Sequence, residues 1–379
     1  MIDAADNGNF PQRGTSLSLS LSLSLSLSLS LDSHAQTNPL KVIITDIVSI
    51  KALSAAWRKF SRGKKSRKDV ALYQKNLQKN LADLHAPLSS GLYKHKSYQR
   101  FTIHDPKQRQ IHKATVADRI VHQAVVTAIE PLFERRFIYD SYSCRVNKGA
   151  HAGVSRLKTF LAGTSKNDTK GVYALKCDVR KYFASIDHEI LLGLIAHHIQ
   201  DDATLELIRT IILSHGAETG KGIPLGNISS QLFANIYLHE LDWFMKQSLG
   251  VKQYIRYCDD FVIVSSDRAY LESLIAPIGN FLKTELQLDL HPSKVSIRSW
   301  RQGIDFLGYV LLPHATVVRT KTQKRVHSKV NTNNYSSYLG VCSHANAYRL
   351  SQTIRNVVWA DGSQQAQNHA TKKAIGDLS

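Results

Sequence analysis

The sequence predicts an α+β fold in which a mixed or antiparallel sheet of short strands is backed by helices. Apolar residues recur at helical spacing in several long segments, and short β-prone apolar runs lie between them. Clusters rich in Gly, Pro and Asn separate the two kinds of segment, as turns do. Strands and helices do not alternate regularly along the chain, so we expect one layer of helices on one face of the sheet.

A low-complexity stretch precedes Asn38, and the sequence that follows it is predicted to be mainly helical in its first part. Its apolar residues follow helical periodicity, with Ile120 and Val121 on the apolar face of the longest segment. Residues 98–114 alternate and contain Pro106, which predicts a hairpin with a basic tip. The expected helices cover residues 44–59, 70–84 and 116–133.

The second part mixes strands and helices. A short strand over 171–177 leads to Asp178, and residues 254–265 read as strand, turn and strand. Gly and Pro mark a turn over 222–226. Further helices are expected over 188–199, 202–213, 227–249 and 270–286, further strands over 287–298 and 304–312, and a basic, mostly helical tail from residue 319.

Residues 16–31 are eight Ser-Leu pairs. Half of the positions are serine, so this stretch is too polar for a transmembrane helix, and it lacks the continuous apolar region of a signal peptide. A CT dinucleotide repeat read in triplets encodes the same alternation. We therefore expect residues 1–40 to be a low-complexity extension, disordered or misannotated, that lies outside the fold.

The chain is strongly basic. Its 379 residues contain 49 Lys plus Arg against 30 Asp plus Glu, a formal net charge of +19. This balance suggests a polyanionic partner, with nucleic acid ahead of an anionic membrane, although a basic solvated surface is the plain alternative. The four cysteines form no CxxC pair, so neither a zinc site nor a disulfide framework is indicated, and a cytoplasmic location is expected.

Three acidic residues lie at the ends of apolar strands. Asp178 follows the strand over 171–177, and Asp259 and Asp260 occupy the turn inside 254–265. Carboxylates at strand ends can converge on one point, and hard cations such as Mg2+ prefer oxygen ligands. Two such ions could activate an attacking oxygen and stabilise a leaving one in phosphoryl transfer. The alternative for each acid taken alone is a simple cap on a strand or turn.

The residues around these acids resemble two sequence boxes of reverse transcriptases. YCDD at 257–260 is similar to the YxDD box of that family, and KCDVRKYFASID at 176–187 is similar to its strand-to-helix box. The resemblance covers nearly everything from residue 41 onward. It implies a right-hand polymerase fold, with fingers and palm over 41–312 and a basic, nucleic-acid-binding thumb over 313–379.

The resemblance also implies roles for the acids and the nucleotide site. Asp178 and Asp259 would be the principal ligands of two Mg2+ ions, with Mn2+ as a possible substitute, and Asp260 would support them. Asp187 is instead expected to be a helix N-terminal acid. The segment 105–111 resembles the part of the fingers that grips the incoming triphosphate. The further nucleotide-binding candidates are Lys107, Arg109, Phe183, Leu225, Gly226, Gln231 and Lys294. Of these, Phe183 would exclude a 2′-hydroxyl, and Lys294 would protonate pyrophosphate or be an ordinary surface lysine.

Several segments resemble primer and template contacts of the family. The stretch 141–151 and the stretch 118–124 are similar to two further boxes, and 306–308 is similar to the grip on the primer end. Cys258 is expected beside the primer end or in ordinary packing. The primer and template candidates are Arg145, Lys148, Tyr257, Phe306, Leu307 and Gly308.

The box LGNISSQ at 225–231 points to one subgroup. Many bacterial members have QGxxxSP, whereas Leu225 and Gln231 flank Gly226 here in the form found in diversity-generating retroelements. There the enzyme copies a template RNA with errors opposite adenine. The expected partners are template RNA, primer, cDNA, dNTPs and a small basic accessory protein, with no membrane. The alternatives are a group II intron-like or retron-like enzyme, and a non-catalytic RNA-binding scaffold.

Overall fold

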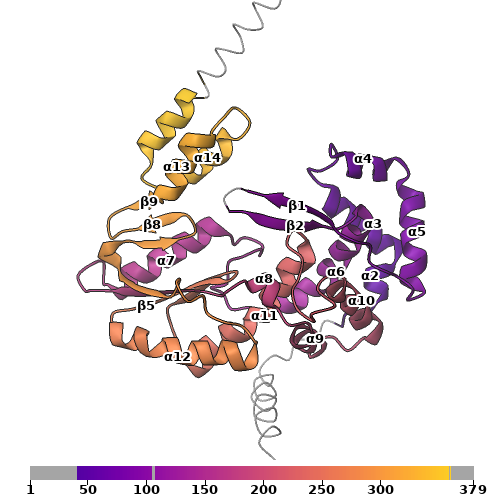
Figure 1. Cartoon of the computed structure of the whole chain (residues 1–379), viewed down its shortest axis with the longest axis horizontal. Coiled ribbons are helices and arrows are strands. Elements are labelled where there is room, and N and C mark those ends of the chain that lie inside the picture. Colours follow the sequence, from indigo (N-terminus) through magenta and orange to yellow (C-terminus); the bar gives the residue numbers. More distant parts are fainter. Residues whose placement is uncertain (1–40, 105–106, 358, 360–379) are drawn as a thin grey trace, which may run out of the picture. The chain divides into compact units, whose positions relative to one another are not determined.

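The computed structural model describes residues 41–104, 107–357 and 359. The Ser-Leu extension over 1–40, residues 105 and 106 at the tip of the expected hairpin, and the end of the tail over 360–379 lie outside the described residues. The described residues from Val42 onward belong to one compact unit. Helices and small antiparallel sheets make up this unit, which confirms the α+β prediction (Figure 1).

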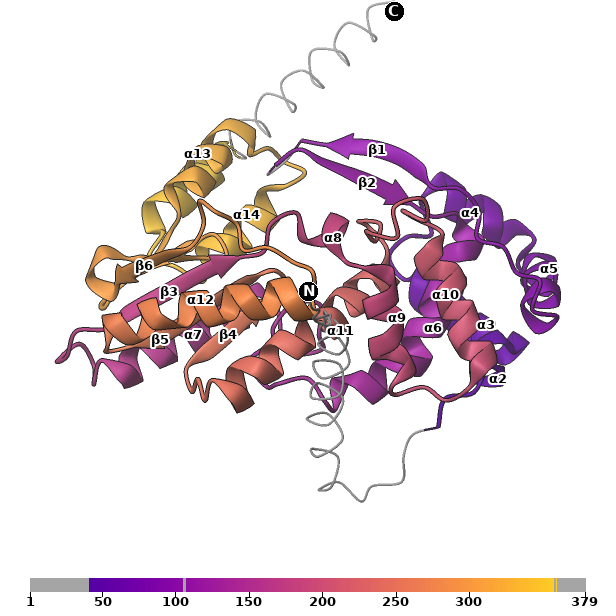
Figure 2. The same cartoon turned by 60° about the horizontal axis from the view of Figure 1, so that its bottom comes forward.

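The N-terminal helices form where they were predicted. The segment expected over 44–59 divides into α2 (Thr45–Val48) and α3 (Ile50–Ser61), because Ser49 is extended and its hydroxyl caps α3 by accepting from the Ala52 amide. Next come α4 (Lys68–Lys75) and α5 (Leu77–Ser89). The long α6 (Val116–Glu134) packs against α3 and buries the face that carries Ile120 and Val121. Between α5 and α6, β1 (Gln99–Ile103) and β2 (Arg109–Lys113) form the expected hairpin (Figure 2).

The main sheet has four antiparallel strands in the order β4-β5-β3-β6. Their bounds are β3 (Tyr173–Asp178), β4 (Tyr254–Tyr257), β5 (Asp260–Ser265) and β6 (Ser296–Ser299). The strand expected over 287–298 is thus much shorter than predicted. Every pairing between these strands is antiparallel, which agrees with the antiparallel form of the expected sheet.

Helices cover both faces of this sheet, which corrects the expectation of a single helical layer. Alternate residues of β5 enter two separate apolar clusters, Phe261 and Ile263 in one, Val262 and Val264 in the other. The first cluster contains α12 (Arg268–Glu285), and the second contains α7 (Ala150–Thr164), which the sequence reading had missed. The two helices lie on opposite sides of β5 (Figure 1).

The remaining helices of the central region connect the strands. α9 (His188–Ala196), α10 (Asp202–Leu213) and α11 (Ile228–Trp243) confirm three predicted helices, and α8 (Tyr182–Ser185) is a single turn. The helix expected over 227–249 ends in a π-helical turn, Phe244–Ser248. Among the described residues, no helix has both the length and the apolar content that crossing a membrane requires.

The predicted strand over 304–312 is instead a hairpin. β7 (Ile304–Phe306) and β8 (Tyr309–Leu311) pair with each other, and β9 (Thr316–Val318) extends the sheet. Leu307 and Gly308 form the turn between β7 and β8, and both have positive φ, 50° and 92°. That combination suits a two-residue hairpin turn, in which Gly is favoured. The tail is helical as expected, in α13 (Thr320–Lys329), α14 (Tyr335–Cys342) and residues 348–357.

Candidate active site

The structure brings the three predicted aspartates together at one end of the main sheet. Asp178 is the last residue of β3, and Asp260 is the first residue of β5. The two are direct partners in the antiparallel register, so their side chains lie on the same face. Asp259 lies with Cys258 in the turn before β5, and its carbonyl accepts a hydrogen bond from the Val179 amide at 3.2 Å.

Two lysines face this acidic cluster. The Nζ of Lys294 donates to Oδ1 of Asp178 at 2.6 Å, and Lys176 lies 3.7 Å from Asp260. Burial raises the pKa of Asp259, and the negative charge of Asp178 raises it further. Burial also raises the pKa of Asp260, although Lys176 opposes that shift. The cluster therefore concentrates negative charge that two ammonium groups only partly offset.

The donor chemistry of this cluster fits a hard divalent cation. Among residues 41–104, 107–357 and 359, no three His, Cys, Asp or Glu side chains are arranged as a ready metal site. Repulsion between Asp178 and Asp259 is nevertheless what bound positive charge relieves, and carboxylate oxygens are the ligands that Mg2+ prefers. Asp178 and Asp259 are the residues that would hold such an ion, with Asp260 beside them.

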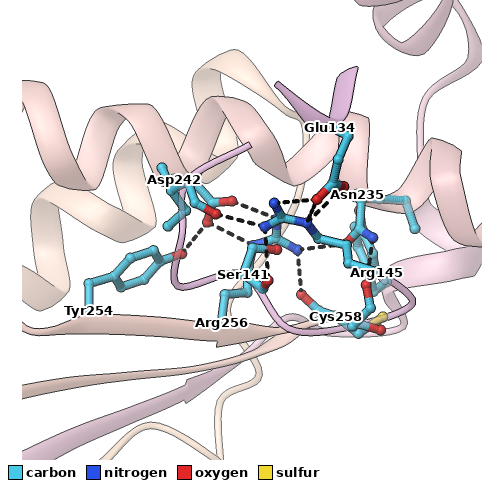
Figure 3. Close-up of polar contacts among 12 residues, drawn as sticks. Glu134, Ser141, Arg145, Asn235, Asp242, Tyr254, Arg256 and Cys258 are labelled. Carbon is cyan, nitrogen blue, oxygen red and sulfur yellow. Dashed lines mark hydrogen bonds and ion pairs between the residues drawn. The ribbon is translucent and has the colours of Figure 1, made fainter. Parts of the chain in front are cut away.

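A buried ion pair lies behind the YCDD turn, and sequence reasoning missed it. Arg256 and Asp242 are both 0% exposed, and Asp242 comes from α11 (Figure 3). The guanidinium donates from Nε to Oδ1 of Asp242 at 2.7 Å and from Nη2 to Oδ2 at 2.6 Å. The Tyr254 hydroxyl donates to the same carboxylate at 2.8 Å. The sequence does contain one indication of this pair, the single arginine inside the apolar run of β4. A charged side chain buried in such a strand needs a partner of opposite charge.

The β1–β2 hairpin is joined to the LGNISSQ box by hydrogen bonds. The His112 amide of β2 donates to the Leu225 carbonyl at 3.0 Å, and the Asn227 amide side chain donates to the His112 carbonyl at 2.9 Å. Gly226 has φ +106° between them, a conformation that favours glycine. Arg109 begins β2 and is exposed, as is Lys107.

The other nucleotide candidates come from the elements around this box. Phe183 is half-buried in α8, and its carbonyl accepts from the Ile223 amide at 2.8 Å. Gln231 is exposed and lines a small pocket with Glu130 and Cys144. Asp187 is the N-cap of α9, since its carboxylate accepts from the amides of Glu189 and Ile190, and this confirms its predicted role.

Two of the primer and template candidates make bonds inside the chain. The Arg145 side chain is 6% exposed and donates to the Glu134 carboxylate and to the carbonyls of Ile138 and Ser141. The Nζ of Lys148 donates to the Tyr139 carbonyl at 2.8 Å and lies 3.3 Å from the centroid of that ring. A phosphate contact by either residue stays a prediction, because these bonds compete with it.

The candidates of the primer grip lie in the β7–β8 hairpin and in β4. Phe306 is fully buried, whereas Leu307 is half-buried in the turn and packs against Gly153 of α7. Gly308 accepts from the Arg319 amide at 2.9 Å, which joins the turn to the start of α13. Tyr257 is half-buried at the end of β4.

A hydrogen-bonded chain of neutral histidines joins the segment before β1 to the start of α11. Nδ1 of His95 lies 2.6 Å from the Lys96 carbonyl and must donate to it, so Nε2 of His95 accepts from Nε2 of His122 at 3.1 Å. Nδ1 of His122 then accepts from the Ser229 hydroxyl at 3.2 Å. Burial, followed by the charges of His95 and Arg119, lowers the pKa of His122 to about 3. Sequence reasoning missed this chain, since no local pattern links its members.

The chain is similar in sequence to a known family and to several known proteins. The family reverse transcriptase (RNA-dependent DNA polymerase) matches residues 94–311, more than half of the chain. Protein YkfC of Escherichia coli is 27% identical over 281 residues, 64% of this chain and 73% of that protein. The group II intron-encoded protein LtrA of Lactococcus lactis is 24% identical over 293 residues, 59% of this chain and 48% of that protein.

A solved structure of telomerase from Candida albicans has a TM-score of 0.47 and 11% identity, with 74% of this chain and 57% of that chain covered. The family match includes β3, the YCDD turn and the β7–β8 hairpin, and therefore all three clustered aspartates. The chain belongs to the reverse transcriptase family.

Proposed function

We propose that this protein extends a nucleic-acid primer on an RNA template, using dNTPs, in the cytoplasm. The observation that supports this most is the cluster of Asp178, Asp259 and Asp260 inside the region that the family matches. The net charge of +19 suits a nucleic-acid partner as well. The proposed products are a cDNA strand and pyrophosphate.

In this proposal Asp178 and Asp259 hold two Mg2+ ions and Asp260 supports them. When bound, such ions supply activation of the primer 3′-oxygen and stabilisation of the leaving oxygen. Lys294, which contacts Asp178, is the proposed proton donor to pyrophosphate. Arg109, with Lys107 second, would grip the triphosphate because a guanidinium binds phosphate bidentately.

The remaining roles follow the same frame. Phe183 would contact the sugar and exclude a 2′-hydroxyl, which makes the product DNA. The hairpin turn at Leu307-Gly308 would hold the primer end. We propose fingers and palm over 41–312 and a nucleic-acid-binding thumb over 313–379, where α13 carries four lysines and arginines, Lys321, Lys324, Arg325 and Lys329.

The test is primer extension on an RNA template with Mg2+ and dNTPs. We expect a DNA product from the wild type and none from Asp259→Asn, because the isosteric amide removes a charge that holds the metal. Asp289→Asn is the matched control, since Asp289 is exposed and pairs only with Lys283 among the ion pairs of the described chain. Template binding by Asp259→Asn should persist and should weaken with salt. A wild type that binds RNA without making DNA would favour the non-catalytic scaffold.

We further propose that the protein is the error-prone enzyme of a diversity-generating retroelement. The support is the LGNISSQ box, whose Leu225 carbonyl pairs with β2 of the fingers. An aliphatic side chain here removes a polar restraint on the nascent base pair, and selectivity rests on a few contacts. Misincorporation opposite template adenine should fall in Leu225→Gln, and an unchanged error rate would remove Leu225 from the explanation.

A group II intron-type enzyme is the second candidate, because LtrA is among the similar proteins. The gene neighbourhood separates the two. Two near-identical repeats that differ mainly at adenines beside the gene would support the retroelement, together with a small basic accessory protein. Intron sequence flanking the gene would support the second candidate.

A further inference from the structure

We propose that Arg256 is a positioning residue for the reaction, which holds the YCDD turn through the carbonyl of Cys258. The inference rests on the proposed polymerase function and adds a residue that does not touch substrate. Three features of the structure carry it: the clamp on the guanidinium, the conformation of Cys258 and the way in which Arg256 joins separate segments.

The guanidinium is held before it reaches the turn. Asp242 accepts from Nε and Nη2 in the bidentate arrangement, and the Tyr254 hydroxyl donates to the same carboxylate (Figure 3). Neither member of the ion pair is exposed, so water does not compete for these bonds. Nη1 of Arg256 makes no bond to Asp242 and is directed toward the turn. The two bonds to Asp242 fix the plane of the guanidinium and therefore the direction of Nη1.

Nη1 donates to the Cys258 carbonyl at 3.1 Å. Cys258 has φ +57°, in the left-handed region that non-glycine residues rarely adopt. Because the peptide plane is rigid, fixing the Cys258 carbonyl also fixes the amide nitrogen of Asp259. The bond therefore determines where the main chain of Asp259 begins, and with it where that carboxylate lies relative to Asp178.

Arg256 also joins the turn to two other parts of the site. Its Nη1 lies 3.3 Å from Oδ1 of Asn235 in α11, and the Asn235 amide group donates to the Ser143 carbonyl at 2.8 Å. The main chain of Arg256 is bonded as well. The Arg256 amide donates to the Asp140 carbonyl, and the Arg256 carbonyl accepts from the Tyr142 amide, both at 2.9 Å. The 140–143 segment thus lies against the edge of the sheet at Arg256, beside the turn.

A lysine cannot replace these contacts. A guanidinium presents a planar fork of donors, whereas an ammonium is a single point of charge on a flexible stem. Arg256→Lys can keep an ion pair with Asp242, but it then has no second, rigidly directed group for Cys258. The substitution therefore separates the buried charge pair from the hold on the turn.

The experiment compares Arg256→Lys with Arg268→Lys in single-turnover primer extension on an RNA template. Arg268 donates from Nε to the Glu272 carboxylate at 2.9 Å, an exposed ion pair within α12 that belongs to no proposed site. We expect Arg256→Lys to lower the rate of the chemical step on the order of 100-fold, as a misplaced reacting group does. The KM for dNTP and the affinity for template should change less than about twofold, since neither interaction is made by Arg256. Arg268→Lys should leave the rate of chemistry unchanged.

A second substitution provides a rescue that a purely structural role would not give. Asn tolerates the left-handed region better than other non-glycine residues, so Cys258→Asn should restore part of the lost rate in the Arg256→Lys background. Should Arg256→Lys fail to fold, the apolar double variant Arg256→Met/Asp242→Leu takes its place, with the same loss expected. An active wild type with an unchanged rate in a folded Arg256→Lys would overturn the positioning role alone. The positioning role would also be overturned if the rate of Arg256→Lys fell only in proportion to the fraction of unfolded protein, or if Cys258→Asn restored none of the lost rate. A wild type that makes no DNA would overturn the proposed function and this inference together.

Discussion

Two buried polar networks hold α11, one near each end, and they differ in charge. At its start, Ser229 ends a chain of neutral histidines that reaches His95, before β1, through His122. Near its other end, Asp242 binds the fully ionised Arg256 behind the YCDD turn. The hydrogen bonds of the histidine chain form only when the correct ring nitrogen of each histidine carries the proton. The ion pair is instead held by the attraction of two opposite charges, which no water screens because both side chains are buried. The same helix is therefore tied to the segment before β1 by a neutral network and to the YCDD turn by an ion pair.

Removing one partner of the ion pair should give the largest effect. Arg256→Met leaves the Asp242 carboxylate buried without its counter-charge, so we expect the free energy of unfolding to fall by about 3–5 kcal/mol. Urea denaturation measures it. Adding Asp242→Leu should restore most of the loss, because an apolar pair can replace a buried ion pair at little cost. A single variant as stable as the wild type would contradict the fully buried pair.

Acid should weaken the neutral network next. The folded-state pKa of His122 is about 3, below the ordinary value of 6.5, so the unfolded chain binds a proton first as pH falls. The stabilisation is complete above about pH 6.5 and is lost as the pH falls toward 3. Between pH 7.5 and 5 we expect a loss of about 2 kcal/mol from this group.

The control for the acid experiment is His122→Leu, since other histidines titrate too. Burial lowers the pKa of His239 to about 3 and that of His215 to about 4. In His122→Leu the unfolding free energy should still depend on pH through His239 and His215, but the contribution of His122 to that dependence should be absent. Parallel pH profiles of unfolding free energy for variant and wild type would show that His122 takes no part.

Shortening the neutral chain at its end should cost less. Ser229→Ala removes the donor to Nδ1 of buried His122, and we expect a loss of about 1–2 kcal/mol in unfolding free energy. Ser90→Ala removes an exposed hydroxyl that donates to the Ala86 carbonyl and should cost less than about 0.5 kcal/mol. Equal losses in the two variants would mean that burial of the His122 bond does not matter.

A partly exposed ion network at Asp69 gives a contrast with the fully buried pair of Arg256. Burial raises the pKa of Asp69, but its hydrogen bonds with Lys113 and Arg119 outweigh burial and lower it to about 2. Because Asp69 is one-third exposed, Asp69→Asn should cost below about 1 kcal/mol, and salt should reduce that cost. Thermal unfolding at low and high ionic strength measures this, and a salt-independent loss would contradict the role of exposure.

The sequence located what depends on local pattern. Apolar periodicity gave the helices that became α6 and α11, and the alternation around the YCDD turn gave β4 and β5. The convergence of the three aspartates followed from carboxylates at the ends of adjacent strands, together with the family resemblance.

What depends on distant partners was not predictable. The helix α7 was missed, and with it the second covered face, because its apolar residues pack on strands about a hundred residues away. The hairpin at Leu307-Gly308 was read as one strand, since its tight turn interrupts the apolar run by only two residues. The partners of Arg256 and His122 come from other elements, and their match in geometry appears only in the folded chain.

The order of the main sheet has a consequence for how the chain folds. β3 lies between β5 and β6, and both neighbours come later in the chain. From Asp178 to Asp260 there are about 80 residues, which a ribosome adds in roughly 4–16 s at 5–20 residues per second. During that time both edges of β3 lack their native partners, and an unpaired apolar strand is a template for aggregation. We therefore expect fragments that end before β5 to aggregate or to need a chaperone, and the sheet to form only late in synthesis.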